Sequence, residues 1–127
     1  MVSHKVCGTM KHALLLVAAA VCSAAVVRCE LPKADADRIV AAIYQVEGGS
    51  KARVPYGILS VRVASREEAR RVCYRTVQNN HTRWLKAGRP GSFLHYLANR
   101  YCPPSADPRG NRNWKANIGA LVKGGAR

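Results

Sequence analysis

One glutamate, Glu47, has surroundings that suit a catalytic acid. It precedes Gly48 and Gly49, and on a helix drawn with 100° per residue it lies between Val40 and Ile43, inside an apolar arc. Apolar surroundings disfavour a carboxylate anion, and the negative end of a helix dipole does the same. Both effects keep a carboxyl group protonated, as a general acid working near neutral pH requires. An exposed glutamate at a frayed helix end is the alternative interpretation.

Four segments with helical spacing of apolar residues are predicted to form the helices that position this glutamate. They cover residues 35–47, 65–87, 93–102 and 114–123. The second begins with a capping box formed by Ser65 and Glu68, and Ser92 caps the third. Residues 54–63 are rich in β-branched side chains and lack a helical period, which predicts a short extended segment. We therefore expect an α+β, mostly helical domain, with a small β excursion after the first helix.

Length and composition exclude several classes of protein. The chain has 127 residues, enough for one domain, and its 21 Lys+Arg against 7 Asp+Glu give a formal net charge of +14. An apolar content of 48% is too high for a disordered basic tail. The chain has neither GxGxxG nor GxxxxGK[ST], and no run of about 18 uninterrupted apolar residues. A nucleotide-binding Rossmann enzyme and a multi-span membrane protein are therefore both excluded.

The N-terminal residues have the pattern of a secretory signal peptide. Residues 1–12 are basic and residues 13–27 are mostly apolar. Small residues occur near the end of the apolar run, at Ser23–Ala25. We expect a signal peptide over residues 1–24, a linker over 25–34, a domain over 35–127, and export to the periplasm or the extracellular space. A short membrane anchor is the alternative, although the apolar run spans only about 22 Å as a helix against a hydrocarbon core of about 30 Å.

Cleavage after residue 24 would leave three cysteines in the exported chain. They are Cys29, Cys73 and Cys102. An oxidising compartment favours one disulfide and one remaining thiol, and three pairings are possible. We favour a Cys73–Cys102 disulfide, because both residues fall inside predicted helices. The sequence contains neither CxxC nor HxxxH, so we expect no metal site, and we expect no cofactor.

The order of motifs resembles the catalytic region of the lysozyme-like superfamily, and most nearly the goose-type lysozymes and soluble lytic transglycosylases. A helix ending in Glu47 is followed by Gly-Gly-Ser and by Tyr-Gly-Ile-Leu-Ser-Val over residues 56–61. Residues 99–103 (Asn-Arg-Tyr-Cys-Pro) and the pair Asn113–Trp114 look like the tyrosine loop and the closing helix of that superfamily. The resemblance covers about residues 35–123 and includes small exported bacterial proteins.

The resemblance implies a peptidoglycan-cleaving enzyme with Glu47 as its catalytic acid. The substrate-side residues that it implies are Tyr56, Gly57, Ser60, Asn99 and Tyr101. Packing in the core is the alternative role for both tyrosines. Two features depart from the family: Ser60 stands where the transglycosylases usually have glutamine, and their Tyr-Asn-Ala-Gly motif is absent.

Few carboxylates are available for a second catalytic role. Most glycosidases place two carboxylates around the bond they cleave. The only acidic residues that follow Glu47 in the sequence are Glu67 and Glu68, at the start of a basic helix, and Asp107, in an Asp-Pro turn. A single-acid route therefore fits better, in which the substrate's own N-acetyl or 6-hydroxyl group intercepts the cation. The predicted activity is that of a lytic transglycosylase or muramidase.

The excess of positive charge is compatible with three kinds of partner: peptidoglycan strands, nucleic acid and anionic lipid. The basic residues of the 65–87 segment are spread along one face, and no nucleic-acid-binding motif is present, so nucleic acid is disfavoured. We expect a monomer that acts on peptidoglycan glycan strands. The alternative function is that of a non-catalytic cationic exported protein that binds wall polymer or nucleic acid.

Overall fold

Helix α1 (Lys33–Val46) is the first element of the structure, a computed structural model that describes residues 29–125. Its buried residues recur at helical spacing and include Ala36, Ile39, Val40 and Ile43. The helix begins two residues before the predicted boundary at 35. The predicted signal peptide, over residues 1–24, lies outside the described residues.

Side-chain caps begin the next two helices where the sequence predicted them. The Ser65 hydroxyl accepts a hydrogen bond from the Glu68 backbone N–H (3.1 Å) at the start of α2 (Arg66–Lys86). The Glu68 carboxylate accepts one from the Ala64 N–H (2.7 Å), one residue earlier than in a standard capping box. Ser92 accepts a hydrogen bond from the His95 N–H (3.2 Å) and caps α3 (Phe93–Tyr101).

The last helix, α4 (Pro108–Gly124), begins six residues before the predicted start at 114. Asp107 is its N-cap and accepts a hydrogen bond from the Gly110 N–H (2.8 Å). The Asp-Pro pair was interpreted as a turn, but proline at the first helical position after an aspartate cap is equally a helix start. The low helix propensity of Gly110 and Asn111 concealed the first turns.

The predicted β excursion is wrong for the described residues, which contain no strand. Residues 54–63 instead form a 3-10 turn, η2 (Pro55–Gly57), followed by irregular backbone; a shorter turn, η1 (Gly49–Lys51), precedes them. Tyr56 and Gly57 both have positive φ (60° and 63°), which bends the chain away from an extended path. No second extended segment is available for pairing. The mostly helical prediction is confirmed.

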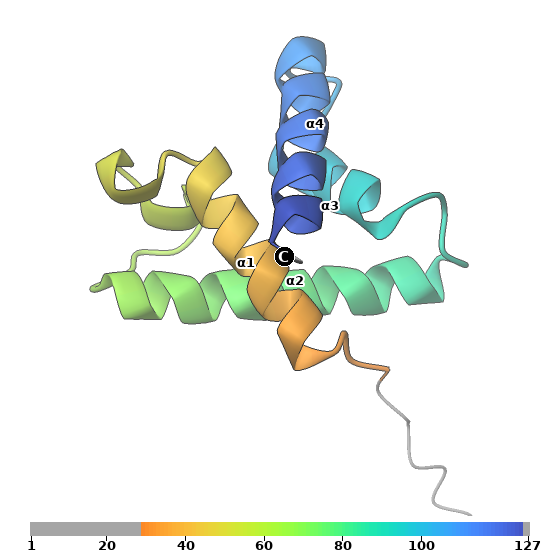
Figure 1. Cartoon of the computed structure of the whole chain (residues 1–127), viewed down its shortest axis with the longest axis horizontal. Coiled ribbons are helices and arrows are strands. Elements are labelled where there is room, and N and C mark those ends of the chain that lie inside the picture. Colours follow the sequence, from red (N-terminus) through yellow and green to blue (C-terminus); the bar gives the residue numbers. More distant parts are fainter. Residues whose placement is uncertain (1–28, 126–127) are drawn as a thin grey trace, which may run out of the picture.

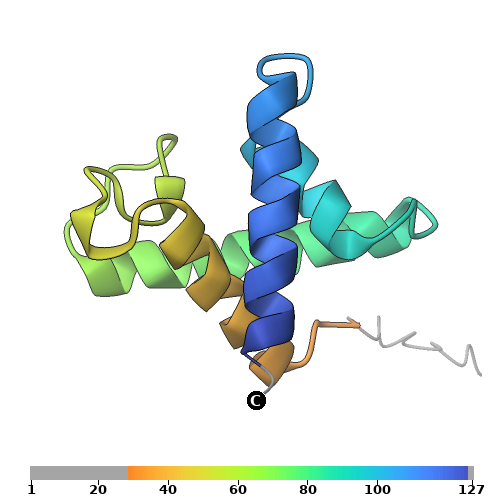
Figure 2. The ribbon, with the colours of Figure 1, turned by 45° about the horizontal axis from the view of Figure 1, so that its top comes forward.

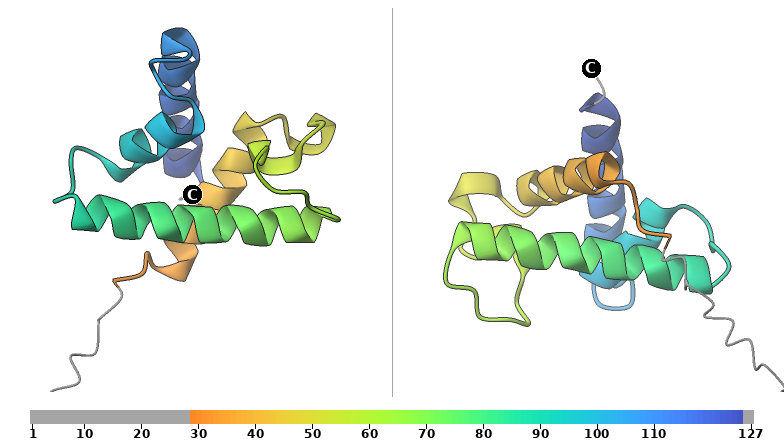
Figure 3. Two further views of the ribbon diagram at one scale, coloured as in Figure 1. Left: turned by 180° about the vertical axis from the view of Figure 1, so that it is seen from behind. Right: turned by 90° about the horizontal axis from the view of Figure 1, so that it is seen from below.

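Helix α1 contacts both α2 and α4. Figure 1 shows α1 crossing the long α2, with α4 running transverse to α2. The segment with η1 and η2 joins the end of α1 to the start of α2, and η2 packs on both helices (Figure 2). Helix α3 packs against α2 and α4 (Figure 3). The C-terminal end of α1 therefore meets η2 and the side of α4.

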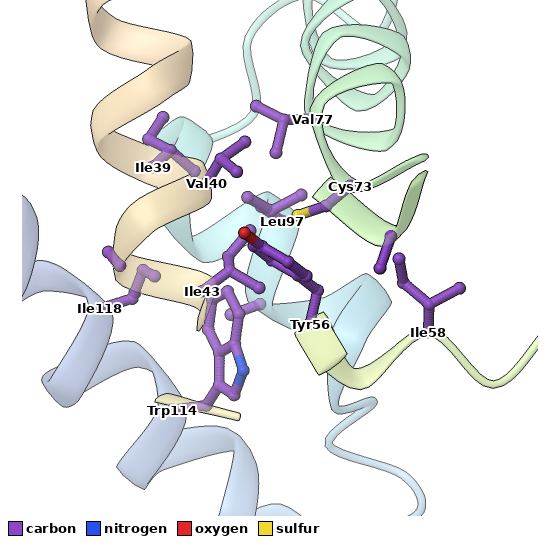
Figure 4. Packing of buried hydrophobic residues seen from close by; sticks show 13 residues of the cluster. Ile39, Val40, Ile43, Tyr56, Ile58, Cys73, Val77, Leu97, Trp114 and Ile118 are labelled. Atoms are coloured by element: carbon purple, nitrogen blue, oxygen red, sulfur yellow. The ribbon is translucent and has the colours of Figure 1, made fainter. Parts of the chain in front are cut away.

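A single apolar cluster joins all four helices and η2. Its largest fully buried side chains are Ile43, Leu97, Ile118, Val40, Val77 and Cys73. Figure 4 shows these residues converging from α1, α2, α3 and α4, with the Tyr56 ring among them. Because the cluster includes residues from every helix, it fixes the relative positions of the residues at the end of α1.

Replacing Leu97 by alanine tests this core. Leu97 is 0% exposed, so Leu97→Ala should lower the free energy of unfolding by about 2–5 kcal/mol. Leu59 is 85% exposed, and the matched change Leu59→Ala should alter it by less than about 0.5 kcal/mol. Urea unfolding followed by circular dichroism measures both. Equal losses would contradict the packing described here.

Candidate functional site

Glu47 is the residue at which α1 ends. Its backbone N–H still donates to the Ile43 carbonyl (2.9 Å), while Gly48 turns the chain with a φ of 108°. A φ in this range favours glycine, so the Glu47–Gly48 pair fixes where the helix stops. The Glu47 side chain is partly buried and lies between α4 and η2.

The Glu47 carboxylate is held by a tryptophan from α4. The Trp114 indole Nε1–H donates a hydrogen bond to Glu47 Oε1 at 3.0 Å. Trp114 is 6% exposed and lies on the face of α4 that also buries Asn111 and Ile118. An indole N–H can only donate a hydrogen bond, and a carboxyl oxygen accepts it. The bond therefore fixes one carboxylate oxygen in place.

The second carboxylate oxygen, Oε2, lies against the bare Cα of Gly57. A Cβ at Gly57 would lie 2.6 Å from Glu47 Oε2 and 2.7 Å from its Cδ, closer than real Cβ atoms come to other heavy atoms. The φ of Gly57 is also positive, at 63°. Both facts require glycine at this position. The carboxylate is thus held between an indole N–H and a glycine.

Tyr101 and Cys73 extend the site beneath Trp114. The Tyr101 ring stacks on the Trp114 ring, with centroids 5.3 Å apart and planes at 20°. Its hydroxyl lies 3.5 Å from Cys73 Sγ. Burial raises the pKa of Tyr101 well above its usual value, and the Cys73 thiol and the Glu47 carboxylate add to the increase. Burial also raises the pKa of Cys73 to about 11. Both groups are therefore protonated near neutral pH.

The described residues show no Cys73–Cys102 disulfide: both of these cysteines, and Cys29, are free thiols in this structure. The reason is the direction of the side chains at the end of α3. Successive helix residues differ by about 100° in direction, and it is Tyr101 that faces Cys73. The Cys102 thiol points instead toward the Asp107 carbonyl (3.9 Å).

The other predicted substrate-side residues differ in their access to Glu47. Tyr56 is 6% exposed and packs against Tyr44 (centroids 5.1 Å apart), so its ring belongs to the core (Figure 4). Burial raises the pKa of its hydroxyl. Asn99 is exposed, and its side-chain oxygen accepts a hydrogen bond from Asn111 (3.1 Å). Ser60 is exposed on the loop after Gly57, and within the described residues it has no side-chain hydrogen bond.

Sequence reasoning did not assign Trp114 and Asn111 to the site. The resemblance placed Trp114 in the closing helix without a role, and Asn111 lay before the predicted start of that helix at 114. The spacing of Asn111, Trp114 and Ile118 on one face of a helix was the available signal. This spacing was missed because the last helix was predicted to begin at residue 114, which left Asn111 outside the helix.

No metal centre is indicated. Among residues 29–125, no group of three or more His, Cys, Asp or Glu side chains could hold a metal ion. No helix in this range is both long and apolar enough to cross a membrane.

Comparison of the chain with protein-family models, with curated proteins and with solved structures finds no match in any of the three. Its function is therefore proposed from the chemistry of its own residues.

Replacing Gly57 by alanine tests the contact with the carboxylate. Gly91 has a similar φ of 66° but nothing within 4 Å of an added Cβ, so Gly91→Ala should cost about 1–2 kcal/mol from backbone strain alone. Gly57→Ala should cost clearly more, because the Cβ also meets the Glu47 carboxylate. When Glu47 is also replaced by alanine, the additional cost of Gly57→Ala over Gly91→Ala should disappear, because the carboxylate is no longer there. Denaturant unfolding of the four variants measures this, and an excess that persists without the carboxylate would refute the contact.

Proposed function

We propose that the protein cleaves the glycan strands of peptidoglycan, as a lytic transglycosylase or muramidase, with Glu47 as the single general acid and base. The observation that supports this most directly is the Glu47 carboxylate itself. It is partly buried, it is held through Oε1 by the Trp114 indole N–H, and its Oε2 has the space left by Gly57. A positioned carboxyl group of this kind can pass a proton to a glycosidic oxygen.

The roles of the other carboxylates support a single-acid route. Asp35 pairs with Arg38, and Asp37 pairs with Lys33 and Arg70. Glu68 and Asp107 cap helices through the Ala64 and Gly110 N–H groups, and Glu30 and Glu67 are exposed. No other carboxylate is thus held beside Glu47 to act as a nucleophile or a second base.

The proposed reaction uses the substrate's own groups in place of a second carboxylate. Protonated Glu47 gives its proton to the glycosidic oxygen, the bond from that oxygen to the sugar C1 breaks, and positive charge develops on the sugar. The substrate's 6-hydroxyl oxygen then bonds to C1 and returns its proton to Glu47, which leaves a 1,6-anhydro sugar. In the muramidase variant a water molecule takes the place of the 6-hydroxyl group.

The substrate, the compartment and the monomeric state remain expectations from the sequence. The net charge of +14 suits an anionic cell-wall polymer, and the signal-like segment at residues 1–24 suits export. The candidates for contact with the sugar are Tyr101, next to Trp114, and Asn99, which is exposed near the start of α4. The family relationship to the lysozyme-like superfamily that the resemblance implied is part of this proposal.

A non-catalytic cationic protein is the second candidate function. Arg71 and Arg75 on α2 are exposed and form no ion pair with described residues, so they are available to a polyanion. On that account Glu47 would be dispensable.

Replacing Glu47 by glutamine distinguishes the two functions. Glu47→Gln keeps the side-chain volume and an acceptor for the Trp114 N–H, so the protein should remain folded. It removes the proton donor, and cleavage should fall about 10²–10⁴-fold. The matched variant Glu67→Gln, at an exposed position, should keep full activity. Mass spectrometry of the soluble products from purified peptidoglycan gives the answer: 1,6-anhydro products identify a transglycosylase, and reducing ends identify a muramidase. If neither the variants nor the original protein release soluble products, the result favours the non-catalytic cationic protein.

Replacing Trp114 by phenylalanine tests how Glu47 is positioned. Trp114→Phe keeps an aromatic ring for Tyr101 to stack on and removes the N–H donor. Hydrogen bonds to charged groups contribute about 1.5–3 kcal/mol, so kcat should fall about 10–100-fold while KM changes little. Trp84→Phe removes an N–H that donates to the Gly91 carbonyl (3.2 Å) and serves as the control. An equal loss of kcat in both variants, or a change in KM alone, would argue against a positioning role.

A further inference from the structure

A basic pocket of about 430 Å³ is lined by residues of α1 and α2, and Glu47 is not among them. Figure 1 shows these two helices crossing. Its lining residues are Lys33, Asp37, Arg70, Arg71, Tyr74 and Arg75. Four of these six side chains are cations and only one is an anion. The volume lies in the usual range for sites that hold small molecules or substrate groups.

Asp37 forms ion pairs with two of the four cations, Lys33 and Arg70. Its Oδ2 accepts a hydrogen bond from Lys33 Nζ (2.5 Å), and its Oδ1 accepts one from Arg70 (2.7 Å). These bonds hold the pKa of Asp37 below its usual value, so the carboxylate stays ionised. Both of its oxygens are therefore engaged on one side of the pocket.

Arg71 and Arg75 are the two cations of the pocket that form no ion pair with described residues. They are four residues apart on α2 and so lie on the same face, where like charges repel. Both are exposed, and neither forms an ion pair with described residues. A guanidinium group presents paired N–H donors that match the two oxygens of a carboxylate. An anion between these arginines would offset their repulsion.

The Tyr74 hydroxyl is a further hydrogen-bonding group among the residues that line the pocket. Its hydroxyl oxygen accepts a weak hydrogen bond from Gln78 Nε2 (3.4 Å). The hydroxyl proton is therefore still available to a ligand oxygen. The pocket thus combines two guanidinium groups, one hydroxyl and one fixed ion-pair network, which suits a ligand with separated monoanionic groups.

We propose that this pocket binds the free carboxylates of the acidic peptide stems attached to the glycan, an inference that rests on the function proposed above. Asp37 lies ten residues before Glu47 on α1, which places the pocket about 15 Å from the catalytic carboxylate along the helix axis. A fully extended peptide of about five residues spans about 17 Å. Each of the two guanidinium groups of Arg71 and Arg75 matches the two oxygens of one carboxylate, so the pair suits two separated carboxylates of one peptide. The pocket therefore anchors the peptide while Glu47 acts on the sugar.

Binding of the free stem peptide to the full chain, measured by isothermal titration calorimetry, tests the proposal without any turnover. The double variant Arg71→Gln/Arg75→Gln should bind the peptide about tenfold more weakly or worse. Arg83→Gln/Lys86→Gln removes the same charge from the far end of α2 and should bind it as the original protein does. A peptide whose carboxylates are capped as amides should bind poorly to every variant.

Three outcomes would overturn the proposal. Equal weakening by both double variants would mean that net charge, and not the pocket, attracts the peptide. Undiminished binding of the amide-capped peptide would remove the carboxylate as the recognised group. Binding of inorganic pyrophosphate, lost in Arg71→Gln/Arg75→Gln while the peptide does not bind, would assign the pocket to phosphate-bearing polymers.

The cleavage assay separates this proposal from that of catalysis. With intact peptidoglycan, Arg71→Gln/Arg75→Gln should raise KM about tenfold and leave kcat unchanged, whereas glycan strands stripped of peptide should be cleaved equally by both proteins. Loss of catalysis in Glu47→Gln is independent of this result. If the protein cleaves no peptidoglycan but still binds the peptide through Arg71 and Arg75, the catalytic function is refuted and the proposed binding site stands.

Discussion

The hydrogen bond from the Trp114 indole to the Glu47 carboxylate joins the end of α1 to the side of α4, and the rest of the site is arranged around it. It requires α1 to stop at Glu47, which the left-handed Gly48 ensures. It also requires α4 to begin early enough for Trp114 to lie within the helix and face α1, which the Asp107 cap ensures. Local signals at two distant places in the sequence thus determine one contact between helices.

A carboxylate at the edge of an apolar cluster is costly unless it is hydrogen-bonded. The indole N–H supplies one bond, and stacking on Tyr101 fixes the plane of the indole. The Tyr101 hydroxyl meets Cys73, deep in the cluster, so the aromatic pair rests on the core. Rigidity at the carboxylate therefore comes from side chains of three helices, α2, α3 and α4, none of which contains Glu47.

The sequence predicted the elements with strong local signals and missed features that depend on tertiary contacts. The Ser65 and Ser92 caps and the end of α1 follow from short patterns, and they were confirmed. The predicted extended segment does not form a strand for two reasons. A strand needs a partner segment to pair with, and Tyr56 and Gly57 have positive φ values that interrupt an extended path. The described residues show no Cys73–Cys102 disulfide, because Tyr101 and not Cys102 faces Cys73 at the end of α3, and the sequence pattern does not reveal that direction. The role of Trp114 as a hydrogen-bond donor could not be predicted, since its acceptor lies 67 residues away.

The placement of acidic residues argues for a chemical role of Glu47. In a chain with 21 basic and 7 acidic residues, a protein that only binds anions gains nothing from burying a carboxylate. The carboxylates with described partners cap a helix or pair with a basic side chain, and each such role explains its presence. Glu47 has no ion pair among the described residues, and it needs both a tryptophan and a glycine to be accommodated. Local rules are broken in this way chiefly at functional sites, because stability alone would select an apolar residue there.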